Sequence, residues 1–457
     1  MSYSPLSVVA AICFASVTFT AGQTPQGQAV NPSITAPAPT AKTPSGCLDE
    51  VAGFAAAQQK NLPPPGDPSV MQQRNARLQE INTARLAMTK ACTAQFDPAT
   101  IELSQLAPAI QLFSDAGLND QLQATVDRAL SMVKVPADRA AIIVTAISGM
   151  RRVRPSGSDR PWRVATLYPK IEALVDELDA NPGATFAQKW SVHTSMEGTY
   201  RGDDIDGGII KHGNWVINAA KLFSPDERQR LGPYVVAAHV DMAEAYAGQN
   251  MTDKGIALLR EAKTNWGDLP ATEGSVAPEL ARYELVGTPG KAIVARVWLN
   301  APVGTGPLPM VGAVTLLEFT AHWCGPCRES YPGINRLRAR FADRDFRVVM
   351  VTRLWGYFGT ERNVSADAEI ADDKAYFAGY HLDVPVAIGE ARPVTFTSGQ
   401  VQYLNGQDPN DTAYRVNGIP QIQLIDKKGT IRLIMIGYDN TNESKLGGLI
   451  ESLLNEK

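Results

Sequence analysis

Two cysteines separated by two residues, Cys324 and Cys327, are the side chains of this 457-residue chain best placed to do chemistry. Thiols so close together can form a disulfide and reopen it, which moves two electrons. Such a pair can also supply half of a zinc site, or a disulfide that only stabilises the fold. Zinc usually needs four ligands, yet Cys13, Cys47 and Cys92 form no second pair of this spacing and the five histidines are scattered. We therefore favour reversible thiol chemistry, with no metal and no cofactor besides the disulfide.

The segments around the pair determine how reactive it is. The apolar run Val314–Phe319 predicts a buried strand, and apolar side chains recur at helical spacing after the pair. The cysteines then begin a helix, where free backbone N–H groups and the helix dipole stabilise a thiolate. In such motifs the thiol pKa falls from about 8.5 to between about 3.5 and 7.5. We expect an exposed Cys324 to be the nucleophile and a more buried Cys327 to resolve the mixed disulfide.

Two titratable side chains lie just before the pair. Glu318 stands in the apolar run, six residues before Cys324. Burial of a carboxylate is costly and raises its pKa, so an inward Glu318 is a candidate base for Cys327. If the strand turns Glu318 outward, it is an ordinary surface acid. His322 can stabilise the thiolate when protonated, but an exposed loop histidine with no role is the interpretation we favour.

Several separated motifs resemble the thioredoxin superfamily, and more narrowly the TlpA/ResA-like thiol reductases of the bacterial cell envelope. The run Trp323-Cys324-Gly325-Pro326-Cys327 resembles the thioredoxin active-site sequence. Pro332, five residues later, matches the proline that kinks the first helix of that family. Gly418-Ile419-Pro420 resembles the cis-proline loop, although a plain turn is the alternative. Two strands are expected to follow, Gln421–Ile425 and Thr430–Ile436, joined by a hairpin turn.

The resemblance implies a redox-active disulfide that exchanges with disulfides of client proteins. Pro420 would lie beside that disulfide, and Ile419 would offer backbone groups to an extended substrate. Trp323, Gly325 and Pro326 would contact the same substrate. Glu318 has the spacing of the buried carboxylate that resembles a proton acceptor for the resolving cysteine in thioredoxins.

Two further comparisons with these families concern the acid and the direction of electron flow. Many TlpA/ResA-like reductases carry a glutamate three residues after the second cysteine, whereas this chain has Ser330 there and Glu329 one residue earlier. Gly-Pro between the cysteines is the thioredoxin choice. Thioredoxin, near about −270 mV, is a reductant, and the strong periplasmic oxidant lies near about −120 mV. With Ile419 before the proline, this favours a reductase or a mild isomerase-like exchanger, and we expect a reductase supplied with electrons by an unidentified upstream donor.

The beginning of the chain predicts export. Leu6–Phe19 is mostly apolar and is followed by small residues up to Gly22, which is typical of a secretory signal. Because no Lys or Arg precedes Lys42, a retained N-terminal membrane anchor is the alternative. We expect a signal peptide over residues 1–22 and a disordered linker over residues 23–46, rich in Pro, Thr, Ala and Gln. The protein would then work in the periplasm or another extracytoplasmic space.

Cys47 and Cys92 are the other cysteines that remain after the signal. An even number of cysteines suits a structural disulfide in an oxidising compartment. Closing a loop of this length is worth on the order of 4 kcal/mol in the chain-entropy model. Two unrelated buried thiols, or a second redox pair that relays electrons, are the alternatives.

Residues 47–285 are rich in Ala, Leu, Gln and Arg, and their apolar positions fall at helical spacing. One helix pair resembles a single tetratricopeptide repeat at Ala243, Tyr246, Gly255, Leu259 and Ala262. Because the period of about 34 residues is not maintained, we expect an irregular stack of helical hairpins. Such a stack can bind a protein partner on a concave face or act only as a scaffold. A helical-repeat adaptor with a thioredoxin-like binding module is therefore the alternative function.

Residues 286–457 begin where a Gly- and Pro-containing segment breaks the helical pattern, and they predict a second domain. Strands are expected at Ile293–Leu299, Phe346–Val351 and Val384–Ile388, with a helix at Asp367–Tyr380. Arg392–Asp411 is extra even for the TlpA-like group, so it forms either an active-site rim or a loop. The expected fold class is a helical-hairpin domain followed by a thioredoxin-like α/β domain with a central mixed sheet. A net charge of −4 and a pI near 5.8 argue against nucleic-acid binding.

Overall fold

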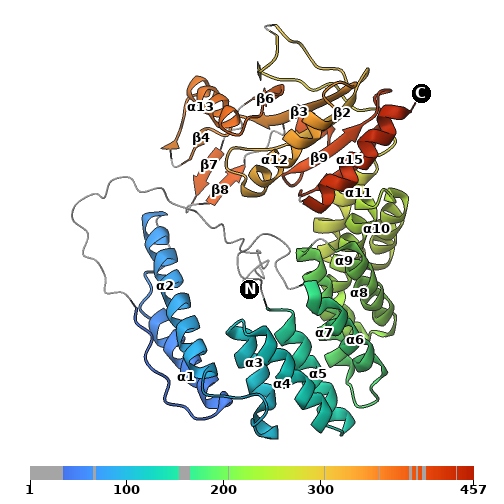
Figure 1. The fold of residues 1–457 in the computed structure, drawn as a ribbon. Coiled ribbons are helices and arrows are strands. Elements are labelled where there is room, and N and C mark those ends of the chain that lie inside the picture. The colour runs from blue at the N-terminus through green and yellow to red at the C-terminus, as the bar shows by residue number, and fades with distance from the viewer. Residues whose placement is uncertain are drawn as a thin grey trace, which may run out of the picture. The chain divides into compact units, whose positions relative to one another are not determined.

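The computed structural model describes residues 34–64, 68–153, 165–203, 205–302, 304–359, 361–390, 394–397, 400–403, 408–438 and 440–456. These residues belong to one unit of the chain, from Ile34 onwards. The expected signal peptide and the first part of the expected linker lie outside the described residues. Helices form the part of the chain that comes first, and an α/β part follows it (Figure 1).

The helical part contains α1 (Pro44–Gln59), α2 (Pro68–Thr93), α3 (Leu106–Asp115), α4 (Asn119–Met132), α5 (Pro136–Met150), α6 (Tyr168–Ala180), α7 (Phe186–Gly202), α8 (Asp206–Ala219), α9 (Pro225–Gly248), α10 (Thr252–Trp266) and α11 (Ala277–Tyr283). Local sequence sets several of these boundaries. Thr185 with Gln188 and Ser224 with Glu227 form capping boxes at the starts of α7 and α9. Gly117, with a φ of 72°, ends α3.

Helices α9 and α10 form the hairpin that resembles a tetratricopeptide unit. Gly255 allows them to approach closely, because a Cβ atom at this position would lie 2.8 Å from the carbonyl oxygen of Ala243. Leu259 and Ala262 are fully buried against α9. The small residues of this motif therefore serve helix packing.

Cys47 of α1 and Cys92 of α2 form a disulfide, with their Cα atoms 6.0 Å apart. Both residues are fully buried, and they pack against Leu112 of α3. The bridge joins the first two helices where these contact the third. No helix in the described part of the chain is long and apolar enough to cross a bilayer.

The α/β part contains a mixed sheet of six strands in the order β1-β6-β3-β2-β9-β10. Its strands are β1 (Val297–Leu299), β2 (Val314–Phe319), β3 (Phe346–Arg353), β6 (Val386–Gly389), β9 (Gln421–Ile425) and β10 (Ile431–Ile436). Strands β2, β3 and β6 are parallel, and the others pair antiparallel. The expected fold class, a helical region followed by a thioredoxin-like α/β domain with a central mixed sheet, is confirmed.

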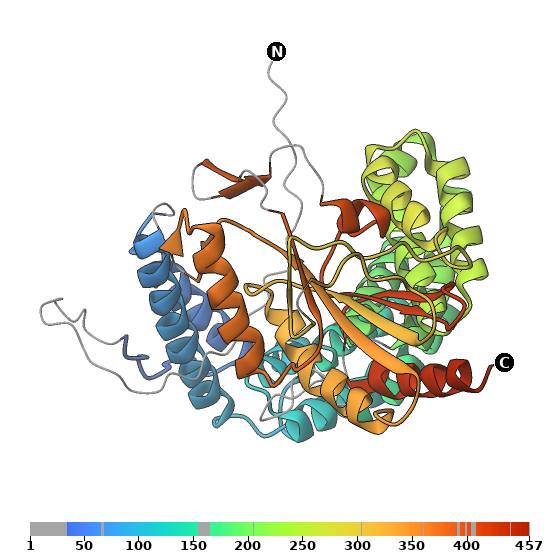
Figure 2. The same ribbon diagram turned by 90° about the horizontal axis from the view of Figure 1, so that it is seen from above.

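Helices cover both faces of this sheet. Leu316 packs in a cluster with α12 (Gly325–Arg340), α13 (Ala366–Gly379) and α15 (Asn440–Asn455). Leu317, the next residue, packs on the opposite face in a cluster with α9, α10 and α11. Helices α12 and α15 lie side by side (Figure 1 and Figure 2). Every side chain of β2 is therefore buried.

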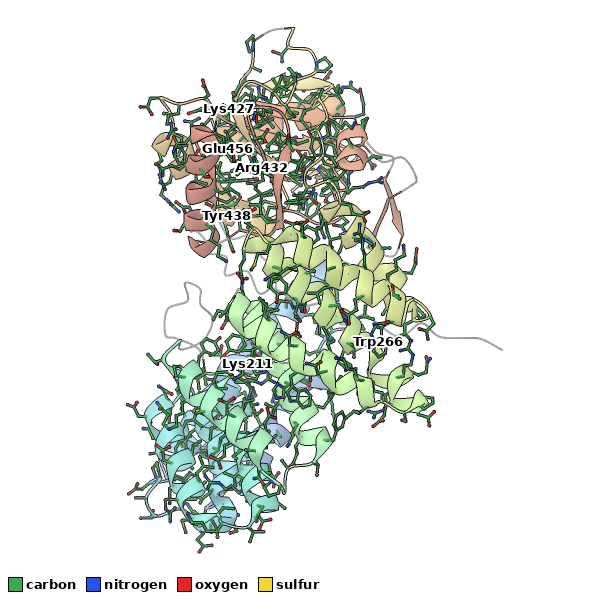
Figure 3. All side chains as sticks on the ribbon, turned by 90° about the vertical axis from the view of Figure 1, so that its right-hand side faces the viewer. Lys211, Trp266, Lys427, Arg432, Tyr438 and Glu456 are labelled. Carbon is green, nitrogen blue, oxygen red and sulfur yellow. A yellow bond between two sulfur atoms is a disulfide. The ribbon has the colours of Figure 1, made fainter. Side chains whose placement is uncertain are left out.

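Salt bridges and hydrogen bonds hold the C-terminal helix to the sheet. Arg432 of β10 pairs with Glu456 at 2.7 Å, and Lys427 donates to the carbonyl oxygen of Leu454 at 2.9 Å (Figure 3). Leu446, Ile450 and Leu453 of α15 are buried against the sheet.

Two sequence predictions about this part change in the structure, and one ribbon was not predicted. The strand expected over Ile293–Leu299 is only Val297–Leu299, because Ile293 instead forms an isolated bridge with Leu308. The segment Arg392–Asp411 is more than a loop, although part of it lies outside the described residues. It contains the ribbon β7 (Val394–Thr397) and β8 (Gln400–Tyr403) and the beginning of α14 (Pro409–Ala413). A second ribbon, β4 (Tyr357–Phe358) and β5 (Glu361–Arg362), follows β3.

Candidate active site

Cys324 and Cys327 form a disulfide at the beginning of α12. Cys324 occupies the N-cap position, and the backbone N–H of Cys327 donates to Cys324 Sγ at 3.2 Å. The helix dipole and this N–H group both favour negative charge on Cys324 once the disulfide opens. The sequence predicted this position for the pair.

Cys324 is less accessible than expected. It is only 2% exposed and Cys327 is fully buried, so the prediction of an exposed Cys324 is wrong for the disulfide form. The reason is that both cysteines belong to the apolar cluster between the sheet and α12. Pro326 and Trp323 remain exposed beside them, and Gly325 is half-buried. These neighbours, and not the sulfur atoms, form the exposed surface at the start of α12.

A set of contacts holds the exposed ring of Trp323, which is 39% exposed. It packs edge-to-face on Trp355, with ring centroids 5.0 Å apart. The guanidinium of Arg353 lies 4.1 Å above the Trp355 ring and pairs with Asp411. Asp411 is the last residue of the extra segment Arg392–Asp411. Through Arg353 and Trp355, this end of the segment is connected to the exposed Trp323 ring. Sequence reasoning missed Arg353 and Trp355, since no motif marks them.

Glu318 is fully buried on the face of β2 that carries α12. The outward orientation considered from the sequence is wrong, because helices cover both faces of the strand. Ser330 Oγ lies 2.7 Å from Glu318 Oε1, and within the described part of the chain Glu318 Oε2 has no hydrogen-bond partner. Burial raises the pKa of Glu318 to about 8, against the lowering effect of the Ser330 hydrogen bond.

Ser330 connects this carboxyl to the helix of the cysteines. Its Oγ lies 2.7 Å from the carbonyl oxygen of Cys327 as well as from Glu318. Ser330 is itself fully buried. The sequence comparison drew attention to position 330, because many TlpA/ResA-like reductases carry a glutamate there. It did not predict the contact between Ser330 and Glu318.

His322 is buried, and the expectation of an exposed loop histidine is wrong. Its ring stacks on Phe358 with centroids 4.5 Å apart, and its Nδ1 lies 3.7 Å from Asp373 Oδ1. Burial lowers the pKa of His322 to about 4, while burial together with nearby Glu369 and Asp372 raises the pKa of Asp373 to about 8. His322 is therefore neutral near pH 7 and brings no positive charge to the cysteines.

The peptide bond between Ile419 and Pro420 is cis. The next residue, Gln421, pairs with Phe319 at the end of β2, so Pro420 lies at the edge of the sheet where the cysteine motif begins. The carbonyl oxygen of Pro420 accepts a hydrogen bond from the backbone N–H of Gly437 at 2.9 Å. Ile419 packs against the cluster that contains both cysteines.

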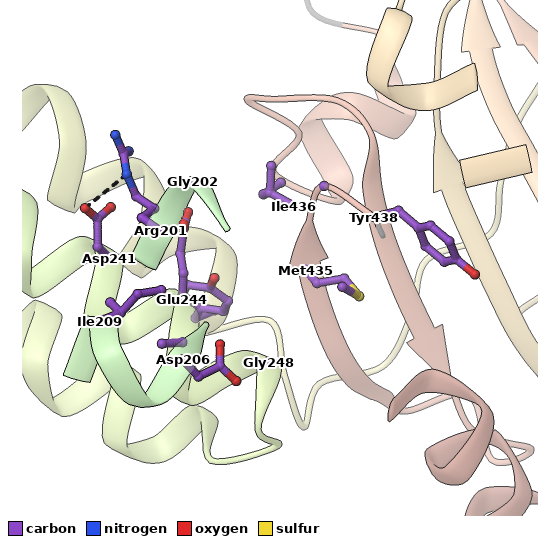
Figure 4. Close-up of a pocket in the computed structure, with 13 residues that line it drawn as sticks. Arg201, Gly202, Asp206, Ile209, Asp241, Glu244, Gly248, Met435, Ile436 and Tyr438 are labelled. Atoms are coloured by element: carbon purple, nitrogen blue, oxygen red, sulfur yellow. Dashed lines mark ion pairs between the residues drawn. The ribbon is translucent and has the colours of Figure 1, made fainter. Parts of the chain in front are cut away.

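A pocket of about 220 Å³ lies between the end of β10 and the helices α7, α8 and α9 (Figure 4). Gly437 lines it on the sheet side, and Arg201, Asp241 and Glu244 line it on the helical side. Arg201 pairs with Asp241 at 3.4 Å. Burial, together with a hydrogen bond to nearby Glu197, raises the pKa of Asp241 to about 9, and burial raises the pKa of Glu244 to about 7. The pocket is thus lined in part by titratable side chains.

The structure brings together most of the predicted site residues. Cys324, Cys327 and Glu318 are connected through α12, and Ile419 and Pro420 lie at the same edge of the sheet. Cys47 and Cys92 form their own disulfide in the helical part. Among the described residues, no group of three or more His, Cys, Asp or Glu side chains is arranged to hold a metal ion.

Comparisons with known proteins agree with the type of site. No family model matches the chain. The thioredoxin-like protein YneN of Bacillus subtilis is 27% identical over 126 residues, which are 28% of this chain and 58% of the relative. Thioredoxin H7 of Arabidopsis thaliana is 34% identical over 53 residues, 12% of this chain and 41% of the relative. The chain thus spans less than two thirds of either relative.

Among solved structures, a thiol-disulfide isomerase from Corynebacterium glutamicum is similar to this chain. It is 22% identical and has a TM-score of 0.28, over 37% of this chain and 97% of that one.

Proposed function

We propose that this protein is a thiol-disulfide oxidoreductase that exchanges the Cys324–Cys327 pair with disulfides of client proteins. One observation carries the proposal: the disulfide begins a helix whose next turn contacts a buried carboxyl group. A disulfide that only stabilised the fold would need neither the helix N-terminus nor the carboxyl. The two curated relatives are a thioredoxin and a thioredoxin-like protein, which supports the same function.

In the reducing direction, the thiolate of Cys324 attacks one sulfur of a client disulfide. The client's other sulfur leaves as a thiolate and takes a proton from water. Cys327 then loses its proton to the carboxylate of Glu318, and its thiolate attacks Cys324 Sγ. The mixed disulfide breaks, the client's second thiolate leaves, and two electrons have moved from the protein's dithiol to the client.

Glu318 serves this reaction in both directions. With a pKa near 8 in the disulfide form, it is mostly protonated near pH 7. When an upstream donor reduces the disulfide, neutral Glu318 can give its proton to the departing Cys327 thiolate. When the protein reduces a client, the ionised minority of Glu318 accepts the proton back. The resolving step is therefore expected to accelerate as the pH rises towards 8.

The proposal also includes the direction of electron flow, the cellular compartment and the roles of the two domains. Gly325-Pro326 supports a reductase, which takes electrons from an unidentified upstream donor and acts in an extracytoplasmic space. Residues 47–285 would form a helical domain that can receive a protein partner, and residues 286–457 the catalytic domain. Trp323, Gly325, Pro326 and Ile419 would contact the extended client chain.

Trapping of mixed disulfides tests the function. In the Cys327→Ser variant the resolving thiol is absent, so Cys324 should remain joined to clients as adducts that dithiothreitol releases. The Cys324→Ser/Cys327→Ser variant is the control and should give none, since Cys47 and Cys92 are bonded to each other and Cys13 lies in the expected signal peptide. If no adducts form and the unchanged protein fails to reduce insulin disulfides, the proposal is wrong. Client capture that persists in the double variant would indicate the adaptor function instead.

A further inference from the structure

Ser330 makes two short contacts that cannot both be hydrogen bonds with an ionised Glu318. Its Oγ lies 2.7 Å from Glu318 Oε1 and 2.7 Å from the carbonyl oxygen of Cys327. A serine hydroxyl has one proton to donate, and a carbonyl oxygen can only accept. A carboxylate can likewise only accept, so one of the two contacts would be left without a proton.

A protonated Glu318 satisfies both contacts at once. The hydroxyl of Ser330 then donates to the carbonyl oxygen of Cys327, and Ser330 Oγ accepts the proton of the carboxyl group. When Glu318 loses its proton, the hydroxyl must turn from Cys327 to Glu318, where a hydrogen bond to a charge is stronger. The orientation of this one hydroxyl therefore follows the protonation of Glu318.

No other group near Glu318 performs this task. Tyr331 of α12 and Tyr438, which follows β10, are the titratable side chains that interact with Glu318 electrostatically. Burial raises the pKa of both phenols, so they remain neutral when Glu318 titrates. The Tyr331 hydroxyl is already bonded to Thr320 at 2.7 Å. In the described part of the chain, Ser330 is the hydrogen-bond partner of the Glu318 carboxyl group, and the other carboxyl oxygen has none.

We propose that Ser330 is a positioning residue that donates to Glu318 whenever this carboxyl is ionised, and so keeps a buried base available to Cys327. The inference rests on the proposed function, because it describes how the resolving step obtains its base. The hydroxyl returns to the Cys327 carbonyl once Glu318 has taken the thiol proton.

A chromogenic disulfide separates the two chemical steps. When the reduced full-length protein reacts with dithiobis(nitrobenzoate), attack by Cys324 releases one coloured thiolate, and attack by Cys327 on the mixed disulfide releases the second. Stopped-flow measurement across the pH range gives a profile for each phase. In Ser330→Ala we expect the midpoint of the second phase to rise by about one pH unit, which is a tenfold slower step below the midpoint. The first phase should stay within about twofold.

A matched pair of variants keeps the test decisive if Ser330→Ala does not fold. Thr keeps the hydroxyl and Val has the same shape without it, so Ser330→Thr should follow the unchanged protein and Ser330→Val should be shifted. The Cys324→Ser/Cys327→Ser variant reports any signal from other cysteines. An unshifted second phase in Ser330→Ala, or equal profiles of the Thr and Val variants, would overturn this inference alone. Absence of the first phase in the unchanged protein would overturn the proposed function as well.

Discussion

Two carboxyl groups, one in each part of the molecule, have pKa values displaced in opposite directions. Glu318 of the sheet contacts one hydroxyl, and its pKa is raised to about 8. Glu172 of α6 accepts hydrogen bonds from Tyr200 at 2.5 Å, from His212 at 3.0 Å and from Lys211 at 2.5 Å. Burial alone would raise the pKa of Glu172, but these hydrogen bonds outweigh it and lower the pKa to about 2.

The partners of Glu172 are themselves held by further hydrogen-bond contacts. His212 Nδ1 lies 2.9 Å from His193 Nδ1, and His193 Nε2 lies 3.1 Å from Asp179. At the other end of this network, Lys211 contacts Glu172. Lys211 lies on the helical part of the molecule in Figure 3. Glu172 is therefore fixed as an anion that holds α6, α7 and α8 together, whereas Glu318 can change its charge. The number of donors, more than burial, separates a structural carboxylate from one that can exchange a proton.

The largest expected effect is on the pH dependence of stability in Glu318→Gln. The folded-state pKa of Glu318 lies above its ordinary value of 4.5, so the folded protein binds this proton more tightly than the unfolded chain. Stability should fall as the pH rises from about 4.5 to 8, on the order of 4 kcal/mol in total. Gln removes this loss, so the oxidised variant should be more stable than the unchanged protein at pH 9. Urea unfolding at pH 5 and pH 9 measures it, and parallel pH dependence in both proteins would contradict the prediction.

The same substitution should slow the resolving step. Without a base, we expect the second phase of dithiobis(nitrobenzoate) reduction to be about a hundredfold slower, with the first phase unchanged. Glu329→Gln is the matched control, because Glu329 is a glutamate of α12, the helix of the cysteines, but is exposed. Both phases of this control should match the unchanged protein. Equal second phases in the two variants would exclude Glu318 as the base.

Glu172→Gln should act in the opposite direction, on stability alone. The lowered pKa of Glu172 stabilises the folded protein above pH 4.5, and this contribution disappears as the pH falls through 2. Because Glu172 is half-buried, we expect the variant to lose about 2 kcal/mol at pH 7. Asp176→Asn removes an exposed partner of the same lysine and should cost well under about 1 kcal/mol. A loss of thiol exchange in folded Glu172→Gln would contradict the division of roles.

The smallest effect is expected for Lys211→Met. Lys211 donates to Glu172, but its side chain is 44% exposed, so its removal should cost less than about 1 kcal/mol at pH 7. His212 and Tyr200 would still hold the carboxylate. The acid pH at which the protein unfolds should move slightly upward, because the pKa of Glu172 rises when one donor is lost. A loss as large as that of Glu172→Gln would mean that the lysine, and not the network, fixes the charge.

Local sequence predicted much of the site. Two strands have the predicted bounds, Val314–Phe319 and Gln421–Ile425. Each is a short segment whose side chains are buried on both faces of the sheet. The start of α12 at the cysteines and the proline at position 420 came from motifs that resemble the thioredoxin superfamily. These features depend on residues close together in the chain.

The surroundings of individual side chains could not be predicted in this way. Whether Glu318 faced solvent depended on which face of β2 it occupies, and it lies on the face that α12, α13 and α15 cover. His322 is buried because Phe358 and Asp373, from later segments, close over it. Trp355 and Arg353 support Trp323 without any sequence signal.

The sequence by itself determined which chemical groups this protein has. They are two thiols at the start of a helix, a carboxyl group in the strand that precedes them, and a proline loop. Only the tertiary structure decided which of these groups can exchange protons. The reason is that a pKa depends on burial and on hydrogen-bond donors, and both come from segments distant in the chain. Glu318 and Glu172 are the same residue type, and their neighbours alone make one a candidate base and the other a fixed anion.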